Sequence, residues 1–213
     1  GVLELVSVLE RLDALTETTP LTVNFSTGLH LHLGFHKATL DQLKSLIVEM
    51  HKAEPFLGSL VSQSRTNDFL MDELYANDPN EYCTPIRSQI TKKALKESTR
   101  KSVLIGSIKS RYGTLNLKPM SSIQTVEFRF HNGTTDSLKV VRWISLCQQV
   151  FHRAIRQGDW GRDLGLYSRR RVIEPATLAE LQAWLRELPG GHKDKFVGST
   201  LERARNIKRY EVL

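Results

Sequence analysis

Two stretches of the chain alternate apolar and polar residues and predict half-buried strands. The first covers residues 124–131, whose apolar residues alternate with three polar ones: Glu127, Arg129 and His131. The second covers Gly28–Gly34, in which leucines alternate with His30 and His32. Because successive side chains of a strand point to opposite faces, each strand should bury its apolar row and present its polar row. Burying a carboxylate, a guanidinium or an imidazole without partners is costly, so the polar rows are the first candidates for a functional site.

The rest of the pattern predicts a mixture of strands and helices. Further strands are expected at 2–6, 103–108 and 113–117, and the histidine strand should begin near residue 21. Amphipathic spacing and capping residues predict helices at 9–17, from Thr39 to about Pro55, and at 85–99, 137–157 and 178–188, with a basic helix after Ser199. Residues 62–83 have the composition of a loop, and 158–176 that of a linker. These elements predict an α+β fold, in which helices pack on the apolar face of a curved, mainly antiparallel sheet and the polar face lines an open cleft.

Composition and charge limit the domain division, the partners and the cellular location that can be expected for the chain. The net charge is +7, and residues 156–213 carry 12 basic and 8 acidic residues against 18 and 15 in residues 1–155. This excess predicts a division into residues 1–157 and a basic helical extension at 158–213. No run of residues reaches the roughly 18 apolar positions of a membrane span, so no membrane partner is expected. Two cysteines, Cys83 and Cys147, are too few for a disulfide framework and indicate a reducing, cytoplasmic location.

The residue types of the two polar rows favour a site for a metal ion and an anion. Carboxylate and imidazole ligands without a thiolate suit Mg²⁺ or Mn²⁺, with Zn²⁺ as another choice. The planar fork of Arg129 suits a phosphate group. The alternative is a cross-strand ladder of salt bridges beside ordinary surface histidines, which is the commoner fate of such charges. The sequence contains no Walker loop and no G-x-G-x-x-G, G-x-S-x-G or H-E-x-x-H motif, so those nucleotide-binding, hydrolase and zinc-protease patterns are excluded.

Four ordered motifs carry a resemblance to a known family. Leu-Val-Ser after Glu4, Gly28-Leu-His-Leu-His-Leu-Gly34, Tyr112-x-x-x-Asn116-Leu-x-Pro119 and Thr125-Val-Glu-Phe-Arg-x-His-x-Gly-Thr134 resemble the putative amidoligase family over about residues 1–155. The resemblance implies a glutamine synthetase-like catalytic domain at 1–157 and leaves the extension uncovered. It also implies an ATP-dependent ligase, which forms an acyl phosphate and then an amide. The expected substrates are a small-molecule or peptide carboxylate and an amine, and the expected cofactors are ATP and Mg²⁺ or Mn²⁺.

The resemblance assigns roles to particular positions. The metal-site positions are Glu4, His30 and Glu127. The positions at the reaction centre are the phosphate-contacting Arg129, with His32 and His131. The positions expected to bind the nucleotide or line its cleft are Arg65, Arg111 and Asn116, with a polar insertion between Arg65 and the Tyr82-Cys83 pair.

The chain departs from the family at one motif, and this leaves two alternatives. The family usually opens with a G-x-E-x-E strand whose glutamates help to hold the metals, and the sequence contains no such motif. The resemblance therefore implies weak or absent ligase activity for this polypeptide alone. One alternative is a basic module that binds nucleic acid through Arg169–Arg171 and the terminal helix, although a solvated, docked helix is the more ordinary explanation. The other is a degenerate ligase fold that serves as an interaction partner.

Overall fold

Three antiparallel strands form the sheet in the part of the chain that the structure describes. This computed structural model describes residues 2–19, 23, 27–62, 65, 66, 82–167, 176–188, 200 and 202. The strands are β1 (Gly28–Gly34), β2 (Leu115–Asn116) and β3 (Thr125–Asn132), in the spatial order β1-β3-β2. The predicted α+β class and antiparallel sheet are confirmed, and the likeness to glutamine synthetase stays a prediction.

Helices make up most of the remaining described chain. The two longest are α2 (Leu40–Gly58) and α6 (Ser137–Gln157). The others are α1 (Val2–Thr18), α3 (Ile86–Gln89), α4 (Lys92–Glu97), α5 (Lys101–Gly106), α7 (Trp160–Asp163) and α8 (Leu178–Glu187), with short 3₁₀ turns at η2 (Lys118–Ser121) and η3 (Leu164–Leu166). None of the helices in the described ranges is long and apolar enough to cross a membrane.

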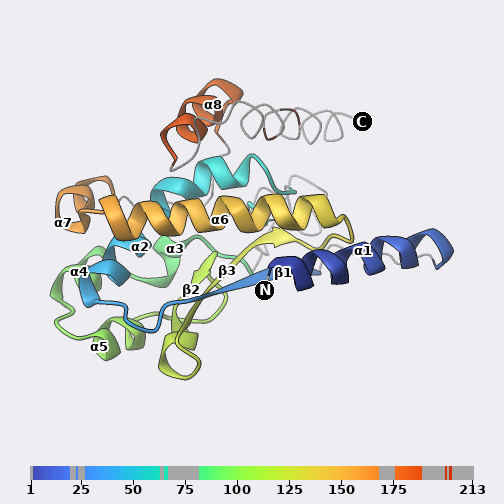
Figure 1. Cartoon of the computed structure of the whole chain (residues 1–213). Helices are drawn as coiled ribbons and strands as arrows, with labels where there is room; N and C mark the ends of the chain where they lie inside the picture. The colour runs from blue at the N-terminus through green and yellow to red at the C-terminus, as the bar shows by residue number, and fades with distance from the viewer. Residues whose placement is uncertain are drawn as a thin grey trace, which may run out of the picture.

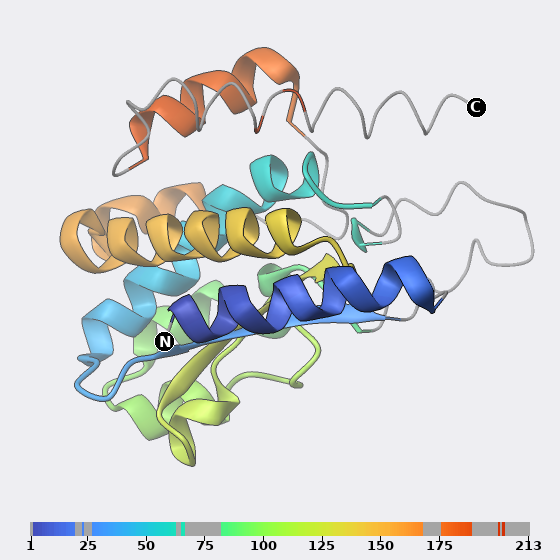
Figure 2. The same cartoon turned by 45° about the vertical axis from the view of Figure 1, so that its right-hand side comes forward.

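The apolar face of the sheet packs against α2 and α6, which lie next to each other (Figure 1). Val126 and Phe128 of β3 are fully buried there, and the leucines of β1 pack against the same core. Phe130 is also fully buried and belongs to the same hydrophobic cluster. Figure 2 shows the order of layers from another side: the sheet, then α2 and α6, then α8. The core therefore sits on one side of the sheet, and this leaves the polar row of β1 on the other side.

Both long helices begin at side-chain caps that the sequence predicted. The Thr39 hydroxyl accepts from the Gln42 backbone N–H at 3.1 Å, and the Gln42 side chain accepts from the Thr39 N–H at 2.9 Å. Asp136 accepts from the Lys139 N–H at 3.0 Å at the start of α6. The predicted end of α6 at Gly158 is also confirmed, and a Cβ there would lie only 2.7 Å from the Cβ of Ser45 on α2. These caps satisfy N–H groups that have no partner within the helix.

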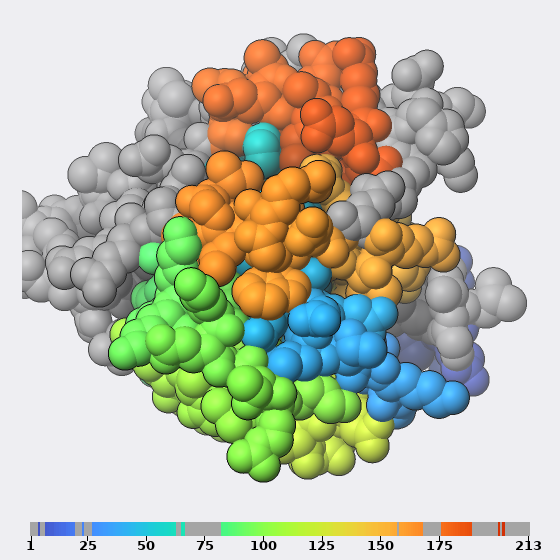
Figure 3. Space-filling model, turned by 90° about the vertical axis from the view of Figure 1, so that its left-hand side faces the viewer, coloured from blue at the N-terminus to red at the C-terminus, as the bar shows by residue number. Residues whose placement is uncertain are grey.

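The segments after α6 pack onto α2. The Trp160 indole donates to Asp41 at 2.9 Å, and the Lys52 ammonium lies 2.9 Å from Asp163. In Figure 3 the start of α2, in blue, lies against the orange end of α6 and α7. The Phe56 ring of α2 stacks on Trp184 of α8 with ring centroids 4.8 Å apart. The predicted domain border at residue 157 is not decided by these contacts and stays a prediction.

Three predicted elements are wrong. The segment 2–6 is the first part of α1, which continues without a break through the predicted helix at 9–17, because no turn residue separates the two. The segment 103–108 lies mostly in α5 and its end, and not in a strand. The predicted helix at 85–99 is two short helices, because Ile90 is extended (φ −140°, ψ 140°) and Thr91 caps a new helix.

Other predicted elements are confirmed where the structure describes them. These are the central strand at 124–131, the helix after Thr39, the helix from Asp136 and the helix after the Thr177–Glu180 capping box. The predicted strand at 113–117 is reduced to the two residues of β2. The Arg169–Arg171 run lies outside the described residues, as do residues 67–81 and, apart from Thr200 and Glu202, the residues beyond 188.

Candidate functional site

A β-bulge in β3 decides which of its side chains reach the polar face. Leu31 pairs with Phe128, but Leu29 pairs with His131, so two β3 residues lie opposite His30 alone. Directly opposed residues of an antiparallel pair share a face of the sheet. Glu127, opposite His32, therefore lies on the polar face, whereas His131, opposite Leu29, is turned to the helix side.

The predicted placement of His131 in the polar row is wrong. Its side chain is fully buried, and its ring lies 4.8 Å from the Trp143 ring of α6. Its Nδ1 lies 2.6 Å from the Asn132 carbonyl oxygen and donates to it. The strict alternation assumed from the sequence fails because the bulge adds one residue to β3.

Replacing His131 by alanine should therefore lower stability as a core truncation does. We expect the free energy of unfolding to fall by about 2–4 kcal/mol, since the ring leaves a cavity beside Trp143. Urea denaturation measures this, with the exposed His36→Ala as the matched control, which should change stability by less than about 0.5 kcal/mol. Equal stability of His131→Ala and the wild type would place the ring outside the core.

Glu127 is the centre of the polar face. Its Oε1 accepts from Arg129 Nη1 at 2.8 Å and lies 3.0 Å from His30 Nδ1. Its Oε2 accepts from the Asn116 side-chain amide of β2 at 2.7 Å. The carboxylate is only 5 % exposed, so these partners compensate a charge that would otherwise be costly to bury. Side chains from all three strands therefore meet at one carboxylate: His30 of β1, Asn116 of β2 and Arg129 of β3 all lie against Glu127. The roles expected for these residues stay predictions.

Aromatic and cationic side chains lie next to Arg129 and extend the site. The Tyr112 ring lies 5.6 Å from the Arg129 guanidinium and 5.1 Å from that of Arg111. Arg111 also donates to the Tyr112 hydroxyl at 3.1 Å, and Tyr82 meets the Tyr112 ring edge to face. Cation–π contacts of this kind hold guanidinium groups in place. Tyr112 stands in the Tyr-x-x-x-Asn motif, but its role as the support of both arginines was missed from the sequence.

A second buried guanidinium lies beside β1. Arg65 is 3 % exposed, and its Nη2 donates to the Thr27 carbonyl. Burial lowers the Arg65 pKa, and the positive charge of Arg129 lowers it further, against the opposing effect of Cys83. The Nε atoms of Arg65 and Arg129 are both buried without a hydrogen-bond partner among the described residues. Two neighbouring guanidiniums with spare donors are suited to an anion.

The two histidines of β1 border this cluster at the surface. Burial lowers the His30 pKa, and the Arg129 charge adds to the effect, so that together they outweigh the raising effect of Glu127. The neutral ring can then donate from Nδ1 to the carboxylate, and Nε2 is left as an acceptor. The His32 Nδ1 is 2.9 Å from the Thr125 hydroxyl, and its Nε2 is 3.7 Å from Glu127 Oε1.

The predicted metal-site residues are not brought together as a set. Glu4 lies on the exposed side of α1 and not on a strand of the sheet. In the described ranges, no group of three His, Cys, Asp or Glu side chains has the arrangement to hold a metal ion. Both oxygens of Glu127 are already bound, one by Asn116 and the other by Arg129. The residues of the polar face therefore do not fit a complete, protein-held ion site.

The order of motifs and this arrangement agree with a sequence comparison. The family described as putative amidoligase enzyme matches residues 2–151, well over half of the chain. The chain belongs to this amidoligase family. The searches of curated proteins and of solved structures gave no match. The family match covers β1, β2 and β3, so every strand of the described sheet belongs to the amidoligase part of the chain.

The thiol of Cys83, in the amidoligase part of the chain, is buried behind β3 and is not available to solvent as a nucleophile. It is fully buried, and its thiol lies 3.4 Å from the Arg129 carbonyl oxygen, to which it donates. Burial raises the pKa of Cys83 to about 12, so the reactive thiolate is scarce near neutral pH. Cys147 is also buried, and its pKa is raised for the same reason.

Both cysteines should resist alkylation in the folded amidoligase chain. Iodoacetamide at pH 8, followed by mass spectrometry, should leave Cys83 and Cys147 unmodified, and both should react after denaturation in urea. The expected protection follows from full burial and from the raised pKa values. Rapid labelling of Cys83 in the folded chain would show a thiol that solvent reaches.

Proposed function

We propose that the chain is an ATP-dependent carboxylate–amine ligase. Membership of the amidoligase family supports a ligase, and the pair of buried guanidiniums, Arg65 and Arg129, supports a phosphate-bearing substrate. The acid would be a carboxylate of a small molecule or peptide, and the second substrate an amine. The observation that carries the proposal is the fixed Arg129–Glu127–Asn116 chain of hydrogen bonds on the polar face.

The proposed reaction has two transfers. A carboxylate oxygen of the acid attacks the γ-phosphorus of ATP, and the bond to ADP breaks, which leaves an acyl phosphate. The amine nitrogen then attacks the acyl carbon, and phosphate leaves as the amide forms. Negative charge moves between oxygens of the phosphate in both steps, so positioned cations lower the barrier. Arg129 and Arg65 supply the positive charge. The hydrogen bonds from Arg129 and Asn116 to Glu127 fix the orientation of the Arg129 guanidinium.

His30 is the proposed acceptor of the proton that the attacking amine releases. Its Nδ1 faces Glu127 Oε1 at 3.0 Å, which leaves Nε2 as the free lone pair of the ring. The ring is 39 % exposed, so a substrate in solution can reach it. A carboxylate behind an imidazole fixes the tautomer and steadies the protonated form. His32 borders the same carboxylate and is held by Thr125.

Mg²⁺ or Mn²⁺ is proposed as the ion that accompanies ATP. Phosphate oxygens are preferred ligands of both ions, and the ion would supply charge neutralisation on the nucleotide. The described residues do not form a complete site for it, as the occupied oxygens of Glu127 show. No step of the proposed reaction depends on the ion.

Calorimetric titration with ADP, with and without Mn²⁺, tests the proposal. We expect the wild type to bind and Arg129→Gln to bind at least about tenfold more weakly, since charge-assisted hydrogen bonds to phosphate are lost. Arg162→Gln is the matched control, because this arginine is 75 % exposed and lies on α7. No binding by the wild type, or equal loss in both variants, would contradict the proposal.

A Gly28→Ala exchange probes the space in front of the two basic groups. The added methyl group would lie 3.1 Å from His30 Nε2 and 3.3 Å from Arg65 Nη2, so both side chains must shift. We expect nucleotide affinity to fall several-fold while the free energy of unfolding changes by less than about 1 kcal/mol. Gly34→Ala on the same strand is the control, because its methyl group would make only an ordinary 3.4 Å contact with His36. Unchanged affinity of Gly28→Ala would place the nucleotide elsewhere.

One alternative has an observation in its favour. The full occupation of Glu127 by Asn116 and Arg129 suits a degenerate ligase fold that acts as an interaction partner. Such a protein would bind neither metal nor nucleotide, so the same titration separates the two functions. The basic residues of the proposed nucleic-acid module lie outside the described residues.

A further inference from the structure

A pocket of about 350 Å³ lies away from the polar face, between α3, α4 and the end of η3. It is lined by Arg87, Thr91, Lys92, Lys93 and Tyr167. None of these residues belongs to the site around Glu127. The volume lies within the range of small-ligand pockets, roughly 300–1,000 Å³.

The charge of this pocket is not balanced by its lining. Three of the five lining side chains are cationic, and none is acidic. Arg87, Lys92 and Lys93 form no salt bridge with the described residues, whereas Lys52 and Arg153 do. Unpaired positive charges around a concave space attract an anion.

Arg87 is fixed in place with donors left over. Its guanidinium lies 4.0 Å from the centre of the Tyr167 ring, and its Nε and Nη1 are buried without a hydrogen-bond partner in the described part of the chain. Buried donors without an acceptor are costly, so an acceptor from outside would be favourable. A guanidinium held against an aromatic ring loses little freedom when it binds.

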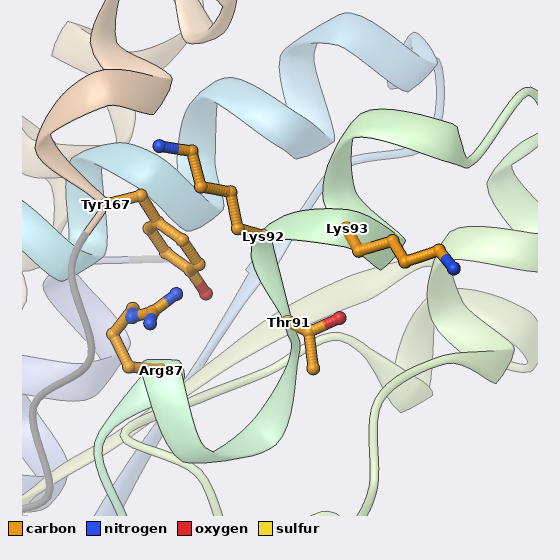
Figure 4. A pocket seen from close by; sticks show the side chains of 5 residues that line it. All are labelled: Arg87, Thr91, Lys92, Lys93 and Tyr167. Atoms are coloured by element: carbon orange, nitrogen blue, oxygen red, sulfur yellow. The ribbon is translucent and has the colours of Figure 1, made fainter.

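Tyr167 is a rigid support for this arginine. Its hydroxyl donates to the Ile90 carbonyl at 3.2 Å, and its ring meets His51 edge to face at 4.9 Å. Figure 4 shows Arg87 and Lys92 on two sides of the phenol ring, while Thr91 and Lys93 point away from it. Arg87 and Lys92 therefore come from α3 and α4 to one place.

We propose that this pocket binds the phosphate group of a small phosphorylated molecule. Arg87 would bind the phosphate oxygens through its unpartnered N–H groups, and Lys92 would add a second charge. A phosphate carries up to two negative charges and several acceptors, which match two cations with spare donors better than a single carboxylate does. The remaining volume would take the group to which the phosphate is attached.

Titration of ¹⁵N-labelled protein with inorganic phosphate, followed by amide NMR shifts, tests the proposal residue by residue. We expect the amides of Arg87, Thr91 and Lys92 to shift with saturation, and the affinity to fall at least about tenfold in Arg87→Gln and several-fold in Lys92→Gln. Lys37→Gln, an exposed lysine before α2, should bind as the wild type does.

The amides of Gly28, Asn116 and Glu127 report separately on the polar face. Failure of the ligase proposal can therefore be distinguished from failure of the phosphate-pocket proposal. Lys92 is exposed, so its variant keeps the test valid if Arg87→Gln does not fold. The proposal is overturned if the pocket amides do not shift in the wild type, or if Arg87→Gln and Lys92→Gln both bind phosphate with the wild-type affinity.

Discussion

Replacing Glu127 by alanine should lower the free energy of unfolding by about 3–5 kcal/mol, the cost of leaving a buried partner charge unpaired. The Arg129 side chain is 11 % exposed and loses its 2.8 Å contact, and the Asn116 amide loses its acceptor. His30 also loses the group that its Nδ1 faces. If the proposed function is correct, ADP binding should be lost in the same variant, because Arg129 no longer has a fixed direction.

Glu127→Gln separates charge from shape in this test. The amide keeps the volume and one acceptor oxygen, so we expect a smaller loss of about 1–3 kcal/mol. Glu10→Gln, on the exposed side of α1, is the matched control and should stay within about 0.5 kcal/mol of the wild type. Urea denaturation gives all three values. A loss below 1 kcal/mol for Glu127→Ala would mean that the polar face is solvated and its contacts are loose.

The second large effect is expected at Glu54, which lies in α2 on the other side of the sheet. Its Oε1 accepts from the Ile86 backbone N–H and from the Thr114 hydroxyl, both at 2.6 Å. Glu54 is 2 % exposed and Thr114 is fully buried, so water cannot replace the lost acceptor. Two buried donors at about 1–3 kcal/mol each predict a loss of roughly 2–6 kcal/mol for Glu54→Ala.

The Glu54 variant should also disturb the polar face. The Thr114 carbonyl accepts the Arg129 backbone N–H at 2.9 Å, so a shift of Thr114 moves β3 at the bulge. Amide NMR shifts at Arg129 measure this coupling. Glu54→Gln retains an acceptor and should keep most of the stability, and Glu97→Gln at the exposed end of α4 is the control. Wild-type stability of Glu54→Ala would show that water reaches the Ile86 and Thr114 donors.

Local patterns of the sequence were sufficient for the elements with strong signals. Capping residues at Thr39, Asp136 and Thr177 placed three helix starts, because a side-chain oxygen at the N-cap binds N–H groups within the next turn. Strict alternation placed the body of β3, because the two faces of a strand have a period of two residues. The short apolar segments 2–6 and 103–108 gave no such period, and both were assigned wrongly to strands.

The sequence indicated four residues that meet at the polar site, but it also included His131, which does not belong to it. The motifs indicated His30, Asn116, Glu127 and Arg129, which the fold brings to one carboxylate. His131 followed the same alternation and yet lies in the core, because the register of β1 against β3 shifts by one residue. A bulge depends on the pairing of two strands almost 100 residues apart, and no local pattern in β3 reports it.

The sequence by itself therefore determined the family, the helix caps and the apolar rows that drive one face of the sheet against α2 and α6. Each of these depends on neighbours within a few positions along the chain or on the order of motifs. The tertiary structure decided the partners of Glu127, the burial of His131 and the meeting of Arg87 with Tyr167. Those outcomes depend on strand register and on the docking of distant segments, where packing and the pairing of buried charges outweigh local preference.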